Sequence, residues 1–306
     1  MMSAMGWALS VILLLALWIL LHHLLLRREE TRLRPCGKLA SIGEYQLHTA
    51  AAGDPAGTPT LVLLSGAGTP APAYDFAPLI RRLESDFPVF APERAGYGYS
   101  DWAYRSRALE EVLEQTRQTL FQAGAKPPFV LIPHSMSGLE ALHWAQRYPD
   151  EVLAIIGLDM AWPQAYDKVP VPSAGTLALA EVLRKLGVQR LLPRQKIEGL
   201  SPEEAKQARM LYIRNFFSLP QQQEALSVIE NAVTVQSGGI PALPFLLFAG
   251  NGKGVGDFWL PCQREMAEKS GGRLIELDCG HYLHHFEADR IAEEIRGFLK
   301  EMEETP

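Results

Sequence analysis

The chain opens with an unbroken hydrophobic run, which covers residues 5–26 and contains no charged residue before Arg27 and Arg28. An apolar helix of about 20 residues is long enough to cross a bilayer. A cleaved signal peptide would carry basic residues ahead of its apolar core and small residues at a cleavage site, and this run has neither. The pattern therefore predicts a transmembrane helix over residues 5–26.

The charges that flank this run predict its orientation. Four arginines follow it, Arg27, Arg28, Arg32 and Arg34, whereas no basic side chain precedes it. Lys and Arg are enriched in the cytoplasmic flanks of membrane helices. We therefore expect a single-pass membrane protein, with a juxtamembrane linker at residues 27–40 and the rest of the chain in the cytoplasm.

From residue 41 onward, strand-like and helix-like segments alternate. Residues 44–53 have the pattern of a first strand, and residues 60–68 and 128–133 are apolar runs typical of strands buried on both faces. Residues 107–124 have the amphipathic spacing of a helix that ends at a glycine. The alternation predicts an α/β domain over residues 41–306, with a mostly parallel sheet flanked by helices.

This alternation is interrupted between about residues 160 and 240. The interrupting stretch is rich in helix-like segments, such as residues 173–187 and 201–217, and prolines separate them. Strand–helix alternation then resumes and closes with an amphipathic helix at residues 288–302. We expect residues 160–240 to form a helical cap inserted into the α/β domain.

Composition excludes several functional classes. Hydrophobic residues make up 47% of the chain and charged residues 21%, as in an ordinary globular protein with a full core. A formal net charge of -6 without a long basic run argues against a nucleic-acid partner. Cys36, Cys262 and Cys279 lie too far apart, or in contexts too unlike, for a disulfide framework or a Cys-x-x-Cys zinc site.

The expected functional site lies where polar residues follow the predicted strands, because open parallel sheets bind ligands beyond the carboxyl ends of their strands. A serine hydroxyl becomes a good nucleophile when a base lies within hydrogen-bond reach and a carboxylate orients that base. Ser135, Asp159 and His281 supply these three groups in that order along the chain. The full set of strand-end candidates is Ser65, Glu93, Ser135, Asp159, Asn251 and His281.

Four segments in sequence order resemble motifs of the α/β-hydrolase superfamily. Residues 133–138 (PHSMSG) resemble the G-x-S-x-G nucleophile elbow, with Pro133 and Ser137 in place of the usual small residues. The segments SGAG, APERAGYGYSD and DCGHYLHHFE resemble the oxyanion segment, the D-x-R-G-x-G-x-S loop and the late histidine segment of the same superfamily. Residues 41–306 are therefore identified as a member of this superfamily.

The resemblance implies roles for individual residues. Ser135 would be the nucleophile, His281 the base, and the backbone amides of Ala67 and Met136 the oxyanion hole. His281 is preferred over His284 and His285 because it directly follows the glycine after a predicted strand. Without the resemblance, Ser135 would be interpreted as a helix N-cap, which is a common role for serine. No cofactor and no metal is implied.

The acidic member has two candidates. Counted from Gly250, the G-x-x-D position that many relatives use after a late strand holds Lys253, and Asp257 falls four residues beyond it. Asp159 closes the preceding strand in LDMAWP, a segment that resembles haloalkane dehalogenases, which take their acid from this location. We favour Asp159 and keep Asp257 as the alternative, because both satisfy the order serine, aspartate, histidine.

The leading hypothesis is a membrane-anchored serine hydrolase that cleaves a small-molecule carboxylic ester, with a lipophilic acyl ester as one candidate, through an acyl-enzyme. An amide or a thioester is the less favoured substrate. We expect the apolar cap residues to line an acyl pocket, namely Leu211, Tyr212, Phe216 and Phe217. The alternatives are an inactive hydrolase-fold binding module, a prolyl-type peptidase, a cofactor-free haloperoxidase or a C–C hydrolase. Dehalogenase chemistry is disfavoured, because those enzymes use an aspartate where this chain has Ser135.

Overall fold

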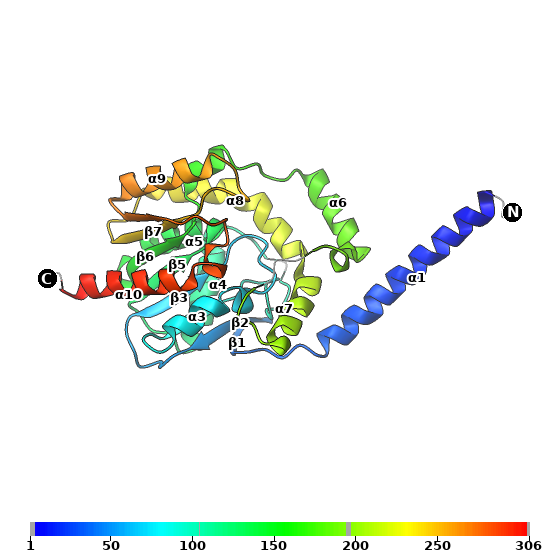
Figure 1. The fold of residues 1–306 in the computed structure, drawn as a ribbon, viewed down its shortest axis with the longest axis horizontal. Coiled ribbons are helices and arrows are strands. Elements are labelled where there is room, and N and C mark those ends of the chain that lie inside the picture. Colours follow the sequence, from blue (N-terminus) through cyan, green and yellow to red (C-terminus); the bar gives the residue numbers. More distant parts are fainter. Residues whose placement is uncertain (1–3, 104, 194–196, 305–306) are drawn as a thin grey trace.

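The computed structural model describes residues 4–103, 105–193 and 197–304, and its centre is an eight-stranded sheet (Figure 1). The strands are β1 (Lys38–Ile42), β2 (Tyr45–Ala52), β3 (Thr60–Leu64), β4 (Val89–Pro92), β5 (Phe129–Pro133), β6 (Val152–Leu158), β7 (Phe245–Ala249) and β8 (Arg273–Glu276). Their spatial order is β1-β2-β4-β3-β5-β6-β7-β8. The pairs β1–β2 and β2–β4 are antiparallel and the others parallel, so the expected mostly parallel sheet is confirmed.

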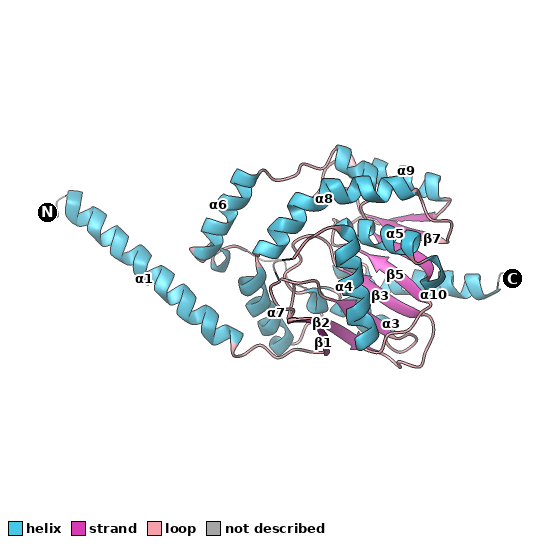
Figure 2. Cartoon of the chain, turned by 180° about the vertical axis from the view of Figure 1, so that it is seen from behind, coloured by secondary structure: helices cyan, strands magenta, loops and turns pink. Residues whose placement is uncertain are grey.

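Helices cover both faces of the sheet, as Figures 1 and 2 show from opposite sides. One face packs against α4 (Leu109–Gln122), α5 (Gly138–Arg147) and α9 (Trp259–Ser270), and the other against α3 (Ala77–Leu83) and α10 (Ala288–Glu304). Every residue of β3, β5 and β7 is buried. A strand that is buried on both faces needs apolar side chains along its whole length. Burial of each Leu or Ile side chain stabilises the fold by roughly 1.5–3 kcal/mol.

The sheet begins earlier than the sequence pattern indicated. Strand β1 starts at Lys38, inside the segment expected to be a linker, and it pairs with β2 along its whole length. Ala40 and Ile42 of β1 are buried, whereas Lys38, Leu39 and Ser41 are exposed. Such a short alternation with a lysine at its start gives a weak strand signal, and the pairing with β2 makes it a strand.

The segment between β6 and β7 is largely helical. It contains α6 (Ala174–Lys185), the 3-10 turn η4 (Val188–Arg190), α7 (Pro202–Asn215) and α8 (Leu219–Gly238). In Figure 1 these helices lie on the side of the sheet where α1 (Ala4–Glu30) is found. Residues 194–196 of the expected cap, and residues 305–306 of the expected domain, lie outside the described residues.

Helix α1 extends away from the body of the molecule (Figures 1 and 2). It is long and apolar enough to cross a membrane, and only 6% of its most apolar window is buried. The helix continues to Glu30, four residues beyond the apolar run that ends at residue 26. Its second half contacts the cap, because the Trp18 Nε1–H group donates to the Leu186 carbonyl oxygen at 2.8 Å.

Candidate active site

Ser135 lies in a sharp turn between β5 and α5. Its φ angle is +54°, a left-handed value that costs a non-glycine residue about 1–3 kcal/mol. Two backbone hydrogen bonds hold the turn: the His134 N–H donates to Leu64 O at 2.9 Å, and the Ala161 N–H donates to Ser135 O at 2.8 Å. A strained, well-supported serine of this kind is typical of a nucleophile elbow.

The two departures from the elbow pattern are accommodated. Pro133 is the last residue of β5, and the His134 N–H continues the pairing with β3 beyond it. The Ser137 hydroxyl can donate to the carbonyl oxygens of Leu64 at 2.7 Å and His134 at 2.9 Å, so its polar group is satisfied within the turn. Gly138 must be small, since a Cβ there would lie 2.0 Å from the Ala161 carbonyl oxygen.

His281 and Asp159 form a direct pair, with His281 Nδ1 2.6 Å from Asp159 Oδ2. Asp159 is fully buried at the end of β6, with φ at +48°. Its other oxygen, Oδ1, accepts the Gly250 N–H at 3.0 Å, which fixes the plane of the carboxylate. Because Nδ1 is engaged by the carboxylate, Nε2 is the His281 nitrogen left for a reacting group.

Ser135 and His281 line the same cavity, which has a volume of about 370 Å³. Ala67 and Met136, the expected oxyanion residues, also line it. Most of the remaining wall is apolar and comes from the cap and from the loop and helix that follow β7. Its members include Tyr166, Val169, Val171, Phe217, Val228 and Trp259.

The alternative acid lies elsewhere. Asp257 is exposed on the loop between β7 and α9, and no hydrogen bond joins it to His281 in the described part of the chain. Asn251, another strand-end candidate, donates to Asp278 at 3.1 Å, away from the cavity wall. The structure therefore brings Ser135, Asp159 and His281 to one place and leaves Asp257 apart.

Comparisons with known proteins identify the family of the chain. The profile described as "Alpha/beta hydrolase family" matches residues 61–294. YbdG of Bacillus subtilis strain 168, described only as an uncharacterized protein, is 33% identical over 221 residues, covering 69% of this chain and 67% of YbdG. The chain belongs to the α/β-hydrolase family.

Solved structures share the fold of this hydrolase at low sequence identity. The enol-lactonase from Burkholderia xenovorans LB400 is 19% identical, with a TM-score of 0.64 over 86% of this chain and 100% of that one. A loop variant of the haloalkane dehalogenase DbeA from Bradyrhizobium elkanii is 20% identical, with a TM-score of 0.62 over 87% and 96% of the two chains. At these identities the likeness shows the fold of the hydrolase and leaves its substrate open.

Glu93 and Arg94 of the APERAGYGYSD segment serve the hydrolase as structural groups. The Glu93 carboxylate accepts the Tyr99 N–H at 2.7 Å and the Ala73 N–H at 3.1 Å, and it bonds His48 at 2.8 Å. It therefore ties the segment to β2 and to α2 (Pro72–Asp75).

The Arg94 guanidinium joins residues 65–66, in the segment expected to supply the oxyanion hole, to α8. It is buried, pairs with Glu224 of α8 at 2.7 Å, and donates to the carbonyl oxygens of Ser65 at 2.9 Å and Gly66 at 3.3 Å. Burial by itself lowers the pKa of Arg94, but the negative charges of Glu224 and its neighbours outweigh burial and raise it. The arginine thus stays charged and holds residues 65–66 in place.

The cap residues that line the cavity differ in part from those expected. Phe217 lines it, but Leu211 is buried in a separate cluster with Ala71, Tyr74 and Tyr99, and Tyr212 lines a different pocket. Phe216 is also not among the residues that line the cavity, so only Phe217 of the four expected residues lies in its wall. Helical spacing predicts which face of a cap helix is apolar, but it does not predict what that face packs against. The wall residues Val169 and Val171 lie in a proline-rich segment without hydrophobic periodicity, so the sequence pattern did not predict that they line the cavity.

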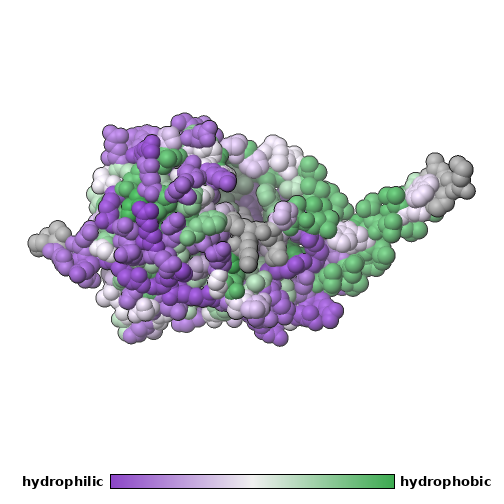
Figure 3. Space-filling view, in the orientation of Figure 1, coloured by the Kyte–Doolittle hydropathy of each residue, from purple (hydrophilic) through white to green (hydrophobic). Residues whose placement is uncertain are grey.

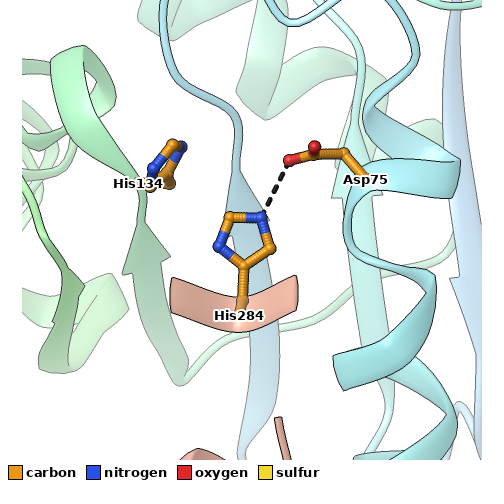
Figure 4. Close-up of side chains that lie close together, drawn as sticks. All are labelled: Asp75, His134 and His284. Carbon is orange, nitrogen blue, oxygen red and sulfur yellow. Dashed lines mark hydrogen bonds and ion pairs between the residues drawn. The ribbon is translucent and has the colours of Figure 1, made fainter. Parts of the chain in front are cut away.

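A buried cluster of histidines around Asp75 supports the turn that carries His281. Asp75 Oδ2 bonds His284 Nε2 at 2.9 Å, and Oδ1 bonds His285 Nε2 at 2.8 Å. Burial by itself raises the pKa of Asp75, but the charges and hydrogen bonds of His284 and His285 outweigh it and hold that pKa far below its ordinary value. His134 lies on the other side of His284 (Figure 4), and its Nε2 bonds the His281 carbonyl oxygen at 3.0 Å.

Asp75, His134 and His284 are also the described side chains best placed for a metal, because their candidate ligand atoms lie within 4.8 Å of one another. Each oxygen of Asp75 accepts a hydrogen bond from a histidine of the 281–285 turn, and the bond to His284 is drawn in Figure 4. We interpret the cluster as a brace between α2 and the 281–285 turn of the hydrolase.

Proposed function

We propose that this hydrolase is a serine esterase in which Ser135, His281 and Asp159 form a catalytic triad. The observation that carries the proposal is the 2.6 Å pair between His281 Nδ1 and Asp159, on a histidine that shares its cavity with the strained Ser135. A positioned base and a nucleophile that face one apolar cavity are what acyl transfer requires.

The reaction follows from these positions. His281 Nε2 takes the proton of Ser135 as Oγ bonds to the ester carbonyl carbon, and the backbone N–H groups of Ala67 and Met136 hold the oxyanion. The imidazolium then gives that proton to the leaving alcohol as the C–O bond breaks. Water, deprotonated by the same histidine, then attacks the acyl carbon. As the bond from that carbon to Ser135 Oγ breaks, the histidine returns the proton to Oγ and the acid is released. Asp159 stabilises the positive charge on His281 in both steps.

The ester assignment is supported by the nature of the nucleophile. Haloalkane dehalogenases, which are among the structural neighbours, resemble this chain in placing an acid after the sixth strand, but they use an aspartate nucleophile. Here the nucleophile position holds Ser135, whose natural reaction is acyl transfer. The neighbour named enol-lactonase agrees with this assignment, because a lactone is a cyclic ester.

The proposal also includes α1 as a membrane anchor with the catalytic domain on the cytoplasmic side. Contacts with the cap support retention of this helix, because Arg190 pairs with Glu29 at 2.7 Å and donates to His22 Nδ1 at 2.8 Å. A cleaved signal peptide would lose both contacts. The arginines after residue 26 support the orientation.

The experiment that tests the triad is reaction of the detergent-solubilised full chain with a fluorophosphonate. We expect one adduct, formed as Ser135 Oγ bonds to phosphorus and fluoride leaves, and peptide mass spectrometry should place it on the peptide that contains Ser135. A heat-unfolded sample is the control, since reaction depends on the folded site. If the folded chain stays unlabelled and hydrolyses no short-chain ester, the binding-module alternative replaces this proposal.

The anchor is tested by alkaline carbonate extraction of membranes that contain the full chain. We expect the protein to stay in the membrane pellet, and its intact mass to include residues 5–26, because an apolar helix of this length partitions strongly into lipid. Release into the supernatant, or a mature mass without these residues, would overturn the anchor and leave the triad proposal standing.

A further inference from the structure

We propose that the outer face of α6, together with Leu191 and Leu192 just after η4, forms a second membrane-contact surface. This surface seats the cap in the bilayer interface and lets the cavity take its substrate from the membrane. The substrate class is then an amphiphilic acyl ester whose acyl chain resides in the bilayer. This inference rests on the proposed esterase function and on the proposed role of α1 as an anchor.

The first observation is an apolar stripe that faces outward. Leu179, Val182 and Leu183 lie at helical spacing on α6 with 58%, 52% and 38% of their surface exposed, and Leu191 and Leu192 are exposed just after η4. The apolar stripe of a surface helix normally packs on the core. On α6 more than half of the Leu179 and Val182 surfaces and 38% of the Leu183 surface stay exposed, while the opposite side meets α8 through the Glu181–Gln222 hydrogen bond at 3.3 Å.

The second observation is that α1 holds this part of the cap at a defined place. The Trp18 N–H donates to Leu186 O at 2.8 Å, and the largely buried Arg190 side chain joins His22 and Glu29. The approach is close, because a Cβ on Gly187 would lie 2.7 Å from the His22 ring. The cap is therefore fixed against one stretch of α1, from Trp18 to Glu29.

The position of that stretch sets the depth of the cap. Residues 5–21 of α1 span about 26 Å at 1.5 Å per residue, close to the ~30 Å thickness of a hydrocarbon core. Trp18, in the last turn of this stretch, and His22, just after it, then lie at the interface, where tryptophan is enriched. Since Leu186, the C-cap of α6, and Arg190 of η4 bond α1 at this level, we place the nearby exposed Leu183 and Leu191 at the same depth. Figure 3 shows hydrophobic surface over α6 and again along α1.

The third observation connects this surface to the cavity. Residues 169–172, which line the cavity, lead into Ser173, the N-cap of α6. On the other side, the exposed ring of Phe217 belongs to the same cavity wall. An acyl chain that leaves the bilayer beside α6 thus meets the apolar residues 169–172 and Phe217, which belong to the same cavity wall as Ser135.

The contact is tested with the full chain in phosphatidylcholine nanodiscs. An NBD label on Leu183→Cys or Leu191→Cys, in a Cys36→Ser background, should be quenched at least threefold more strongly by lipids that carry a nitroxide on the acyl chain than a label on Leu153→Cys. Leu153 is the matched control, because it is also 38% exposed and lies at the amino end of β6, away from the cap. Labelling of the Cys36→Ser parent gives the contribution of Cys262 and Cys279. Equal, weak quenching at all three sites would overturn the inference.

A second measurement separates failure of this inference from failure of the proposed function. The double variant Leu183→Glu/Leu191→Glu should hydrolyse soluble 4-nitrophenyl acetate within twofold of the parent. Its hydrolysis of 4-nitrophenyl palmitate held in phosphatidylcholine vesicles should fall at least tenfold. If both activities of the folded variant match the parent, the membrane-contact surface is wrong. If the parent itself hydrolyses neither ester, the esterase proposal is what fails.

Discussion

Ester hydrolysis by the Ser135→Ala variant is expected to fall by a factor on the order of 10⁴–10⁶ in kcat, which is the scale seen when a triad nucleophile is removed. Ser135 adopts a left-handed φ of +54° in the turn and lines the cavity that His281 also lines. Any turnover that remains would come from binding and from the backbone donors at Ala67 and Met136. The measurement is initial-rate kinetics on a soluble short-chain ester.

Ser85→Ala is the matched control, since Ser85 is an exposed serine just after α3. Its kcat should stay within twofold of the parent. Alanine at position 135 keeps a Cβ in the same backbone conformation, so the thermal midpoint of the Ser135→Ala variant should change little. A folded Ser135→Ala variant that retains more than a tenth of the parent rate would show that the nucleophile is another group.

The Asp159→Asn variant is expected to lose about 10⁴-fold in kcat, as when an asparagine imposes the wrong tautomer on a catalytic histidine. The Gly250 N–H donates to Oδ1 at 3.0 Å, so the amide oxygen of an asparagine would stay there. The amide NH2 group would then replace Oδ2 and face His281 Nδ1. A histidine that accepts at Nδ1 carries its proton on Nε2, and that proton blocks the base.

Asp257→Asn is the control for this variant and also tests the alternative acid. Asp257 is exposed on the loop before α9, so its loss should change kcat less than about twofold, as is usual for a substitution away from the site. The two variants should label with fluorophosphonate in the same rank order as their kcat values. A large loss in Asp257→Asn together with normal turnover in Asp159→Asn would reverse the assignment of the acid.

Most of the fold could be predicted from local patterns. The buried strands β3, β5 and β7 are continuous apolar runs, and α4 and α10 have amphipathic spacing, so their types follow from periodicity. Strand β1 was missed, because its five residues bury only two side chains and pair with β2 through the backbone. Backbone pairing with β2 depends on a neighbouring strand, so the sequence pattern of β1 alone does not predict it.

Some residues of the candidate site could likewise be predicted from local patterns, and others could not. Ser135 and His281 stand out in the sequence, because each lies in a motif directly after a strand, and parallel strands bring their carboxyl ends to one edge. Leu211 and Tyr212 were expected in the acyl pocket and lie in other surroundings. Which face of a cap helix meets the cavity depends on how several helices pack, and spacing along one helix does not determine it.

The sequence by itself determined the family, the order of the three triad candidates and the apolar N-terminal helix, because motifs, chain order and long apolar runs are local properties. Only the tertiary structure distinguished Asp159 from Asp257, since both satisfy the order along the chain and only Asp159 lies 2.6 Å from His281. Only the tertiary structure placed Arg190 of the cap against Glu29 of α1, 161 residues apart in sequence. Such contacts arise when distant segments pack together, and no local pattern encodes their geometry.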